Sequence, residues 1–379
     1  MHKYEEQTRI FRAMKRYNVM IKPASSACNM RCRYCFYADE SCSRQTANYG
    51  RMPQEVSQSI LEKFLSDPAD SYAFAFQGGE PTLAGLPFFE EFVRTADAFA
   101  RPGARVCYAI QTNGLLIDGA WAEFLRRRGF LVGLSIDGTR DIHNHFRPDA
   151  AGRDTYSRAL RCAQLLGRQQ VPFNILTVVT PTVAKHISAI FRDYQKNGFA
   201  YQQYIPCLAP LDGSADSFAP DAKLLGTFWK QLFDLWYKEF TSGNYISIRF
   251  FDNLVYMLQG REPELCSMCG HCNIQYLIEA DGSVFPCDFY ALDAYRLGNI
   301  LTDSLEDIDR RRNELQFIQS SLQPPEACRR CQWGFLCRNG CRRERAQGPG
   351  GKNLYCEGYQ DFFTYAYERL RLAAIRNNR

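Results

Sequence analysis

Residues 18–35 read NVMIKPASSACNMRCRYC, an apolar stretch that predicts a strand over residues 18–24, followed at once by Cys28, Cys32 and Cys35. Three thiolates can hold a [4Fe–4S] cubane and leave one iron open, whereas a structural zinc site needs four closed ligands. Active sites of parallel barrels also lie at the carboxyl ends of the strands. The stretch therefore predicts an iron–sulfur site on a strand-end loop. A zinc knuckle completed by Cys42, or unliganded core cysteines, are the alternatives.

Strand and helix patterns alternate on both sides of this triplet. The expected strands lie near 18–24, 72–77, 105–112, 130–136, 171–180 and 200–205. Residues 53–65 and 117–128 are typical of the helices between them. Such alternation predicts a parallel sheet with right-handed crossovers. Patterning alone does not distinguish a closed or partial (β/α) barrel from an open doubly wound sheet.

The composition of the 379 residues narrows the protein class. With 46% hydrophobic and 23% charged residues, the chain is not expected to be disordered. It contains no run of 18 apolar residues and no secretion-signal pattern at its start, so we expect neither a membrane partner nor export. A net charge of +5 is too small to indicate nucleic-acid binding. The 16 cysteines are interpreted as metal ligands in a reducing cytoplasm.

The second half of the chain has a different pattern. Residues 221–242 predict an aromatic helix that packs in the core, and residues 359–376 predict a final amphipathic helix. Between them, residues 266–356 lack long periodic segments, which predicts a loop-rich module organised by metal instead of apolar burial. Its cysteines suffice for two closed cubanes, while a pair of four-cysteine zinc sites is the alternative. Arginines among them are interpreted as balancing the cluster charge.

Two motifs together are similar to those of radical S-adenosylmethionine (SAM) enzymes. These are the cysteine triplet, with Tyr34 before its last member, and Gly78-Gly79-Glu80-Pro81 after the second expected strand. The resemblance implies that the second motif binds the methionine end of SAM beside the open iron. Reductive cleavage of SAM would then give a 5′-deoxyadenosyl radical.

The later cysteines resemble the SPASM module of radical SAM enzymes that act on peptides. This resemblance implies that one auxiliary cluster is held by Cys266, Cys272, Cys287 and Cys341. It implies that the other is held by Cys328, Cys331, Cys337 and Cys356. Cys269 makes the fourth ligand of the first set ambiguous, and Cys266 is favoured because the family's upstream ligand lies at that longer separation. Three [4Fe–4S] clusters and SAM are the cofactors implied.

Almost the whole chain resembles the anaerobic sulfatase-maturating enzymes, through IKPASSACNMRCRYCFY, FAFQGGEPTLAG, QTNG, FLVGLSIDG and CDFYALDAYRLGNI. The family oxidises a cysteine or serine in a C/S-x-P-x-R motif of a sulfatase to Cα-formylglycine. The resemblance implies that Asp288 is the general base, and that Gln77 and Tyr37 face the peptide. The positions that match SAM contacts are Tyr34, Gly79, Ser135, Arg147 and Leu208.

The implied fold is a partial (β/α)6 radical SAM barrel, then a cysteine-rich SPASM module with two auxiliary iron–sulfur clusters, then a C-terminal helix. The expected boundaries are residues 1–17 for an N-terminal extension, 18–243 for the barrel, 244–358 for the module and 359–379 for the helix. The implied partners are an unfolded or nascent sulfatase and a low-potential electron donor such as flavodoxin or ferredoxin.

Two other functions stay open. One is a SPASM enzyme that forms thioether or carbon–carbon crosslinks in a small peptide. Such enzymes usually carry an added N-terminal recognition domain, and little precedes the first expected strand here. The other is a zinc-stapled binding protein without enzymatic activity, which would be colourless instead of brown.

Overall fold

The computed structural model describes residues 15–213, 218–346 and 350–376. Most of the expected N-terminal extension, the residues around 214–217 in the Pro/Asp/Gly/Ser-rich stretch, and the last three residues lie outside these ranges. None of the helices in the described part is both long enough and apolar enough to span a membrane.

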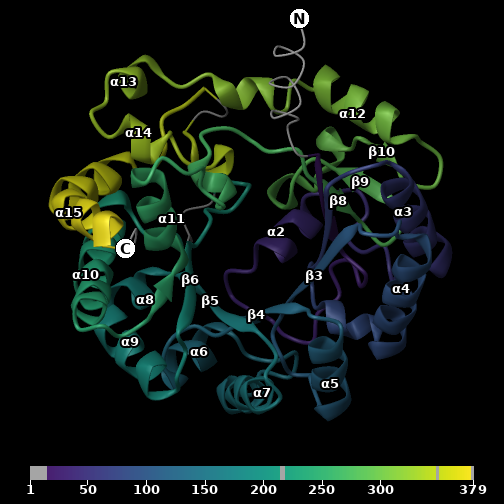
Figure 1. Ribbon diagram of the computed structural model, residues 1–379, viewed down its shortest axis with the longest axis horizontal. Coiled ribbons are helices and arrows are strands. Elements are labelled where there is room, and N and C mark those ends of the chain that lie inside the picture. The colour runs from purple at the N-terminus through teal and green to yellow at the C-terminus, as the bar shows by residue number, and fades with distance from the viewer. Residues whose placement is uncertain (1–14, 214–217, 347–349, 377–379) are drawn as a thin grey trace, which may run out of the picture.

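A curved sheet with helices on its outer side forms the body of the molecule (Figure 1). Its parallel strands are β1 (Arg16–Ile21), β2 (Ser71–Phe76), β3 (Arg105–Thr112), β4 (Leu131–Ser135), β5 (Phe173–Val179), β6 (Tyr201–Pro206) and the short β7 (Ser247–Ile248). The six expected strands are confirmed in place and in their parallel pairing. The implied partial-barrel fold is confirmed as well.

Helices connect these strands and cover the sheet (Figure 1). They are α2 (Phe36–Cys42), α3 (Gln54–Ser66), α4 (Leu86–Phe99), α5 (Gly119–Arg127), α6 (Arg140–Phe146), α7 (Tyr156–Arg168), α8 (Pro181–Lys185), α9 (Ile187–Lys196), α10 (Ala222–Thr241) and α11 (Arg249–Leu258). Those predicted at 53–65, 117–128 and 221–242 agree within two residues at either end. The apolar faces of these helices and of the strands form one continuous core.

The C-terminal module continues the same sheet, which the sequence did not predict. Strand β8 (Tyr276–Ile278) pairs in parallel with β1, and β9 (Ser283–Phe285) and β10 (Gly298–Asn299) follow in antiparallel order. All residues of β8 and β9 are buried. Apolar burial therefore organises this part of the module, and metal is not its sole support.

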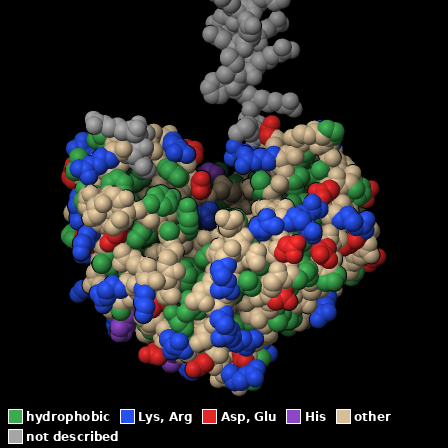
Figure 2. All heavy atoms as spheres, turned by 60° about the horizontal axis from the view of Figure 1, so that its bottom comes forward, with side chains coloured by type: hydrophobic (Ala, Val, Ile, Leu, Met, Phe, Trp, Pro, Cys, Tyr) green, Lys and Arg blue, Asp and Glu red, His purple; other side chains and the backbone are tan. Residues whose placement is uncertain are grey.

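The remaining helices of the module lie beyond this hairpin. They are α12 (Leu305–Glu314), α13 (Glu326–Arg329), α14 (Gly334–Cys337) and α15 (Cys356–Arg376). Helix α15 starts three residues earlier than expected and packs along α10, on the side of the molecule opposite β8 to β10 (Figure 1). On the face seen in Figure 2, basic and acidic side chains are interspersed, and the surface is hollowed near the top of the view.

Candidate active site and cluster-binding cysteines

The first cysteine triplet lies on the loop between β1 and α2. This loop is bonded to the segment that follows α6: the Arg33 amide donates to the Phe146 carbonyl at 3.0 Å, and the Arg31 amide donates to the Pro148 carbonyl at 2.9 Å. The Ala150 amide donates in turn to the Asn29 carbonyl at 3.0 Å. The two loops therefore form one unit at the carboxyl ends of β1 and β4.

The three thiols of this loop fit the donor set of an iron–sulfur cluster. Burial raises the pKa of Cys28 to about 11 and that of Cys32 to about 12, and the charge of Cys35 adds to both. These thiols would release their protons on binding a metal, as cluster ligands do. Cys42, which the zinc alternative requires, is exposed as the last residue of α2.

Gly79 closes the site from the end of β2. A Cβ atom at this position would lie 2.1 Å from the Ala27 carbonyl oxygen, so the position has no room for a side chain. The Gly79 amide donates to the Ser25 carbonyl at 2.9 Å. The next residue, Glu80, is buried and accepts hydrogen bonds from Thr82, Thr112 and the Asn113 amide. The motif thus binds the ends of β2 and β3 to the cysteine loop.

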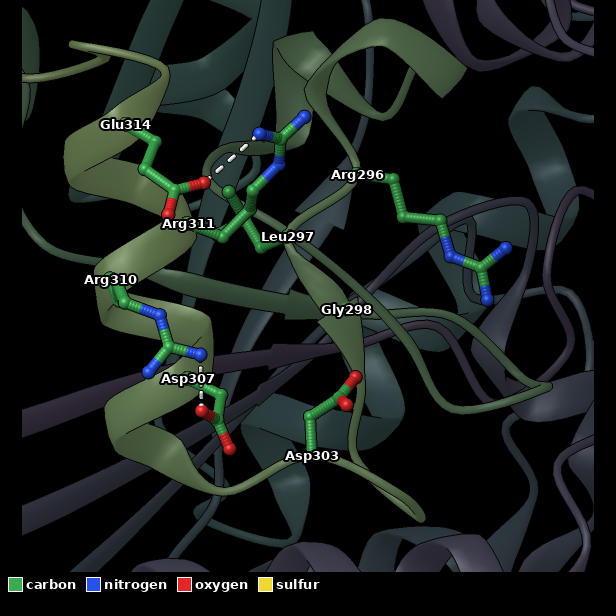
Figure 3. A pocket seen from close by; sticks show the side chains of 8 residues that line it. All are labelled: Arg296, Leu297, Gly298, Asp303, Asp307, Arg310, Arg311 and Glu314. Atoms are coloured by element: carbon green, nitrogen blue, oxygen red, sulfur yellow. Dashed lines mark hydrogen bonds and ion pairs between the residues drawn. The ribbon is translucent and has the colours of Figure 1, made fainter.

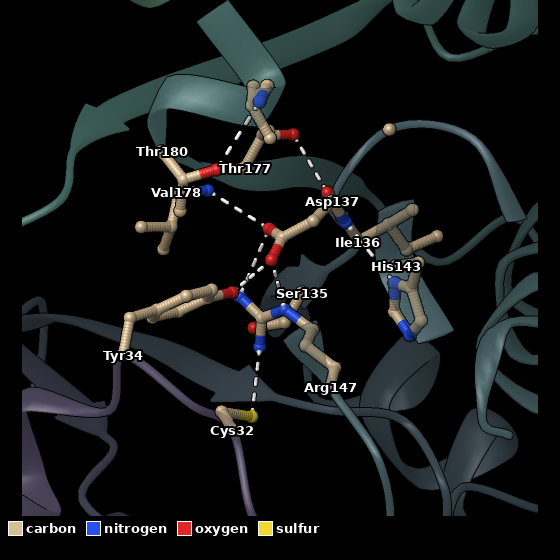
Figure 4. Close-up of polar contacts among 12 residues, drawn as sticks. Cys32, Tyr34, Ser135, Ile136, Asp137, His143, Arg147, Thr177, Val178 and Thr180 are labelled. Carbon is tan, nitrogen blue, oxygen red and sulfur yellow. Dashed lines mark hydrogen bonds and ion pairs between the residues drawn. The ribbon is translucent and has the colours of Figure 1, made fainter. Parts of the chain in front are cut away.

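Asp137, just after β4, connects two of the candidate SAM residues (Figure 4). Its carboxylate accepts hydrogen bonds from Arg147 Nε at 2.9 Å, from Arg147 Nη2 at 3.3 Å and from the Tyr34 hydroxyl. The Val178 amide donates to it at 3.0 Å. Arg147 Nη1 is then left pointing toward Cys32, with 3.9 Å between Nη1 and Sγ. A guanidinium held in this way suits a carboxylate ligand beside the first cluster.

His143 fixes the backbone around this pair. Its Nδ1 accepts from the Asp137 amide at 3.2 Å, and its Nε2 lies 3.1 Å from Thr155 Oγ1, which donates to the Arg147 carbonyl at 2.5 Å. Burial, with the charge of Arg147, lowers the pKa of His143 to about 3. The imidazole is therefore neutral and supports both residues.

The other two candidate SAM residues also follow strand ends. Ser135 closes β4, and its Oγ accepts from Gln111 Nε2 at 3.0 Å. Leu208 is half-buried in the loop after β6. A hydrogen bond holds this loop: the Arg343 guanidinium donates to the Ala209 carbonyl at 2.9 Å. The candidate SAM residues thus come from loops after β1, β2, β4 and β6 and from the end of α6.

Asp288 follows β9 and lies beside helix α2. The Tyr37 hydroxyl donates to its Oδ2 at 2.8 Å, while its Oδ1 is buried without a hydrogen-bond partner among the described residues. Burial raises the pKa of Asp288 to about 6, against the lowering effect of Lys22. A carboxylate with one oxygen held and the other open can accept a proton near neutral pH. Gln77, which was expected to face a peptide, contacts Met20 Sδ at 2.8 Å through Nε2.

A buried charge cluster lies behind Asp288. Lys22 Nζ forms an ion pair with Glu279 Oε1 at 2.7 Å, and Arg44 Nη1 is 2.5 Å from the same oxygen. Lys22 Nζ also lies 5.0 Å from the centre of the Tyr37 ring. Glu40 adds a further acid, whose pKa burial raises to about 8. These charges surround the Tyr37–Asp288 pair on its inner side.

Eight of the nine later cysteines are the predicted ligands of two clusters, in two groups of four. In the first, Cys287 interacts electrostatically with Cys341 and Cys266, and Cys341 interacts with Cys272. Cys269 Sγ lies 3.6 Å from the Leu265 carbonyl. The choice of Cys266 over Cys269 as the fourth member stays a prediction.

The second group, Cys328, Cys331, Cys337 and Cys356, lines a cavity of about 430 Å³ beside α14 and the start of α15. Cys269 lines the same cavity. Among the described residues no three histidine, cysteine or acidic side chains converge as they would around one metal ion. A cubane places four irons between its thiolates, so a wider cavity of this kind fits it.

A second cavity, of about 340 Å³, lies between β10 and α12 and carries no site (Figure 3). Asp307 pairs with Arg310 at 2.5 Å and Glu314 pairs with Arg311 at 3.1 Å. Asp303 accepts from the Asn299 amide at 2.7 Å. The charges of its walls largely satisfy one another.

Sequence reasoning missed Asp137 and Lys22 as parts of the site. Asp137 follows the end of an expected strand, which is where the other site residues were sought. Lys22 interrupts the apolar run of the first strand, and a charge in such a run has to be paired when the strand is buried. Both signals were present, but the partners that give them meaning are distant in the chain.

Comparison with known proteins identifies both parts of the chain. The radical SAM superfamily matches residues 23–193, and an iron–sulfur cluster-binding domain, SPASM, matches residues 266–332. A cysteine-type anaerobic sulfatase-maturating enzyme of Clostridium perfringens is 42% identical, over 93% of this chain and 97% of that protein. A serine-type enzyme of Bacteroides thetaiotaomicron is 29% identical, over 92% of this chain and 88% of that protein.

Solved structures agree with this assignment. Native anSMEcpe with bound AdoMet and Kp18Cys peptide matches with a TM-score of 0.90 and 40% identity, covering 95% of this chain and 99% of that chain. Streptococcus suis SuiB bound to precursor peptide SuiA shares only the fold, with a TM-score of 0.64 at 14% identity over 93% of this chain and 78% of that one. The chain therefore belongs to the anaerobic sulfatase-maturating enzymes, a radical SAM family with a SPASM module whose cofactors are SAM and [4Fe–4S] clusters.

Proposed function

We propose that this member of the family oxidises the cysteine of a C-x-P-x-R motif in a partner sulfatase to Cα-formylglycine. The choice of cysteine over serine is supported by 42% identity to a cysteine-type enzyme against 29% to a serine-type enzyme. The observation that carries the proposal is the buried Asp288, which follows the cluster ligand Cys287 and accepts a hydrogen bond from Tyr37.

Bound SAM and the first cluster supply a radical that removes a hydrogen atom from the Cβ of the target. Cys28, Cys32 and Cys35 hold that cluster. Arg147 would grip the SAM carboxylate through Nη1, which faces Cys32. Gly79, whose missing side chain leaves room for the Ala27 carbonyl, would lie at the methionine end. Tyr34, Ser135 and Leu208 line the rest of the SAM site.

Asp288 accepts the thiol proton of the target as its Cβ is oxidised. The target loses one hydrogen atom, this proton and one electron to give a thioaldehyde, and water then releases hydrogen sulfide and leaves the aldehyde. Cys266, Cys272, Cys287 and Cys341 would hold a cluster that can accept this electron. Proton acceptor and electron acceptor are adjacent because Asp288 and Cys287 are neighbours in the chain.

The partners follow from this chemistry. The target cysteine of a folded sulfatase would be inaccessible, so the substrate is an unfolded or nascent sulfatase polypeptide. A low-potential donor such as flavodoxin or ferredoxin supplies the first electron, and a reducing cytoplasm protects the open cluster.

Anaerobic turnover with a matched pair of peptides tests the proposal. The two peptides differ only in cysteine or serine at the first motif position, and 5′-deoxyadenosine and aldehyde are both measured. We expect the cysteine peptide to be the better substrate. Crosslinked peptide without aldehyde would favour the other class of SPASM enzyme.

The Asp288→Asn variant tests the base. It removes the proton acceptor and keeps the shape, so SAM cleavage should continue while aldehyde formation falls by about 10²-fold or more. Undiminished aldehyde would remove Asp288 from this role. Gln323→Asn, in the exposed turn before α13, is a control that should leave both products unchanged.

A further inference from the structure

The arginines around the last cysteines differ in exposure. Arg330 is exposed, with a side-chain exposure of 83%, and pairs with Glu326 at 3.0 Å. Arg338 and Arg343 are half-buried, while Arg342 and Arg345 are buried, with 8% and 6% of their surface exposed. Water screens an exposed charge but screens a buried one much less, so the buried pair acts most strongly on a nearby cluster.

Main-chain carbonyl groups from three segments hold the Arg345 guanidinium. Its Nη1 donates to the Ser321 carbonyl at 2.8 Å. Its Nη2 donates to Gly340 at 3.1 Å and to Gly270 at 3.3 Å, and Nε donates to Asn339 at 3.3 Å. A planar fork with several donors engaged cannot turn away, so the position of its charge is fixed.

The same segments carry ligands of both auxiliary groups. Gly340 directly precedes Cys341, and Ser321 Oγ accepts a hydrogen bond from the Cys272 amide at 2.8 Å. Asn339 Oδ1 lies 3.6 Å from Cys328 Sγ, which belongs to the other group. Arg345 therefore lies between the two cluster sites.

We propose that Arg345 raises the reduction potentials of both auxiliary clusters together, as a fixed positive charge between them. The proposal rests on the proposed function, in which the first auxiliary cluster takes an electron from the target. A positive charge favours that step, because each cluster gains negative charge on reduction. Because the charge acts on both sites, it raises both potentials and leaves the difference between them nearly unchanged. An electron can therefore still pass from one cluster to the other.

Arg342 offers a comparison at one site only. Its Nη1 donates to the Phe317 carbonyl at 2.6 Å, and its guanidinium lies over the rings of Phe317 and Tyr290 at 4.4 and 5.1 Å. Arg342 directly follows Cys341, and Tyr290 is three residues after Cys287. We assign Arg342 to the first auxiliary site.

A redox titration of the anaerobically reconstituted enzyme, followed by electron paramagnetic resonance, tests this assignment without turnover. Arg345→Gln should make reduction of both auxiliary clusters about tenfold less favourable, a shift of ~59 mV to more negative potential. Arg342→Gln should shift one cluster, and Arg330→Gln should shift neither.

Arg345→Lys separates charge from scaffolding. It keeps the charge and loses most of the fork, so both potentials should stay near those of the wild type. Equal shifts in the lysine and glutamine variants, or loss of auxiliary iron from both, would assign Arg345 to loop structure and overturn the proposal. Formylglycine production by the wild type is measured separately, so failure of the proposed function would be recognised as a distinct result.

Discussion

Asp137 determines where the Arg147 guanidinium points. Because its carboxylate binds Nε and Nη2, Nη1 is the guanidinium nitrogen that faces the Cys32 thiol. Asp137→Asn removes the charge that holds this fork, and a hydrogen bond to a charged group contributes about 1.5–3 kcal/mol. We therefore expect the Kd for SAM to rise about tenfold or more, measured by titrating SAM into the reduced enzyme and following the cluster signal.

A second acid provides the control for that experiment. Asp97 pairs with Arg128 at 2.5 Å on the surface, with a side-chain exposure of 57%. Asp97→Asn also breaks an Asp–Arg pair, yet it should leave SAM binding unchanged. Equal SAM affinity in the Asp137 variant and the wild type would mean that Arg147 keeps its orientation through its backbone supports alone.

Glu40 makes stability depend on pH. Both carboxylate oxygens are buried without a hydrogen-bond partner among the described residues, and burial, with the charge of Asp288, raises the pKa of Glu40 to about 8. The folded chain thus holds this proton more tightly than the unfolded chain. The contribution of Glu40 to the free energy of unfolding is fully present below about pH 4.5 and is lost as pH rises toward 8.

Glu40→Gln should remove that loss. Between pH 6 and pH 9 the wild-type Tm should fall more than the variant Tm by about 2 °C or more, measured by anaerobic thermal unfolding. Glu90→Gln, at an exposed position of α4, should follow the wild type. Parallel curves for all three proteins would show that Glu40 is ionised in the folded chain at pH 6.

At the scale of single residues, sequence could propose ligands but not their surroundings. The cysteines stand in recognisable spacings, and Tyr34 and Arg147 match the family's SAM contacts. Residue type and order were therefore sufficient to propose a role for each. Asp137, Glu40 and Arg345 matter because of what burial brings beside them, and those neighbours come from distant parts of the chain. The ligand and base roles stay predictions until the experiments above are done.

Two glycines set the crossing of α10 and α15. A Cβ on Gly358 would lie 2.0 Å from the Ala222 carbonyl oxygen, and one on Gly226 would lie 2.8 Å from the Gly358 Cα. The helices can approach this closely only where neither has a side chain. Gly358 is two residues from Cys356, so this contact also places a thiol of the second auxiliary group.

Gly358→Ala should therefore push the start of α15 outward. We expect a loss of ~1–3 kcal/mol in stability and of roughly four of about twelve irons per chain, measured by thermal unfolding and iron analysis. Gly167→Ala, in α7, is the control because nothing lies within 4 Å of its added Cβ. Full iron in the Gly358 variant would mean that Cys356 does not depend on this crossing.

The elements of the barrel were predictable because each is long and periodic. Strands β8 to β10 were not, since they have only two or three residues and β8 and β9 are buried on both faces, which leaves no alternation to read. The register between β1 and β8 is a tertiary fact that no local pattern encodes.

The ten-stranded sheet joins both halves of the molecule. Val19 to Ile21 pair with β8, and the Lys22 amide donates to the Ile278 carbonyl at 2.9 Å. A chain ending at Gly243 would leave this edge of β1 unpaired. We expect that fragment to aggregate, whereas a chain ending at Arg376 should stay soluble, as measured by soluble yield and gel filtration. A soluble, monomeric fragment would show that the barrel is an independent folding unit.

The pairing of β1 with β8 also bears on synthesis by the ribosome. Strand β1 emerges first, yet one of its two neighbours is translated roughly 250 residues later. At about 5–20 residues per second, that interval is of the order of 13–50 s. During this interval, the loop with Cys28, Cys32 and Cys35 follows a strand that is unpaired along one edge. Iron delivered to this loop before translation ends would meet an incomplete sheet, so we expect cluster insertion to follow chain release.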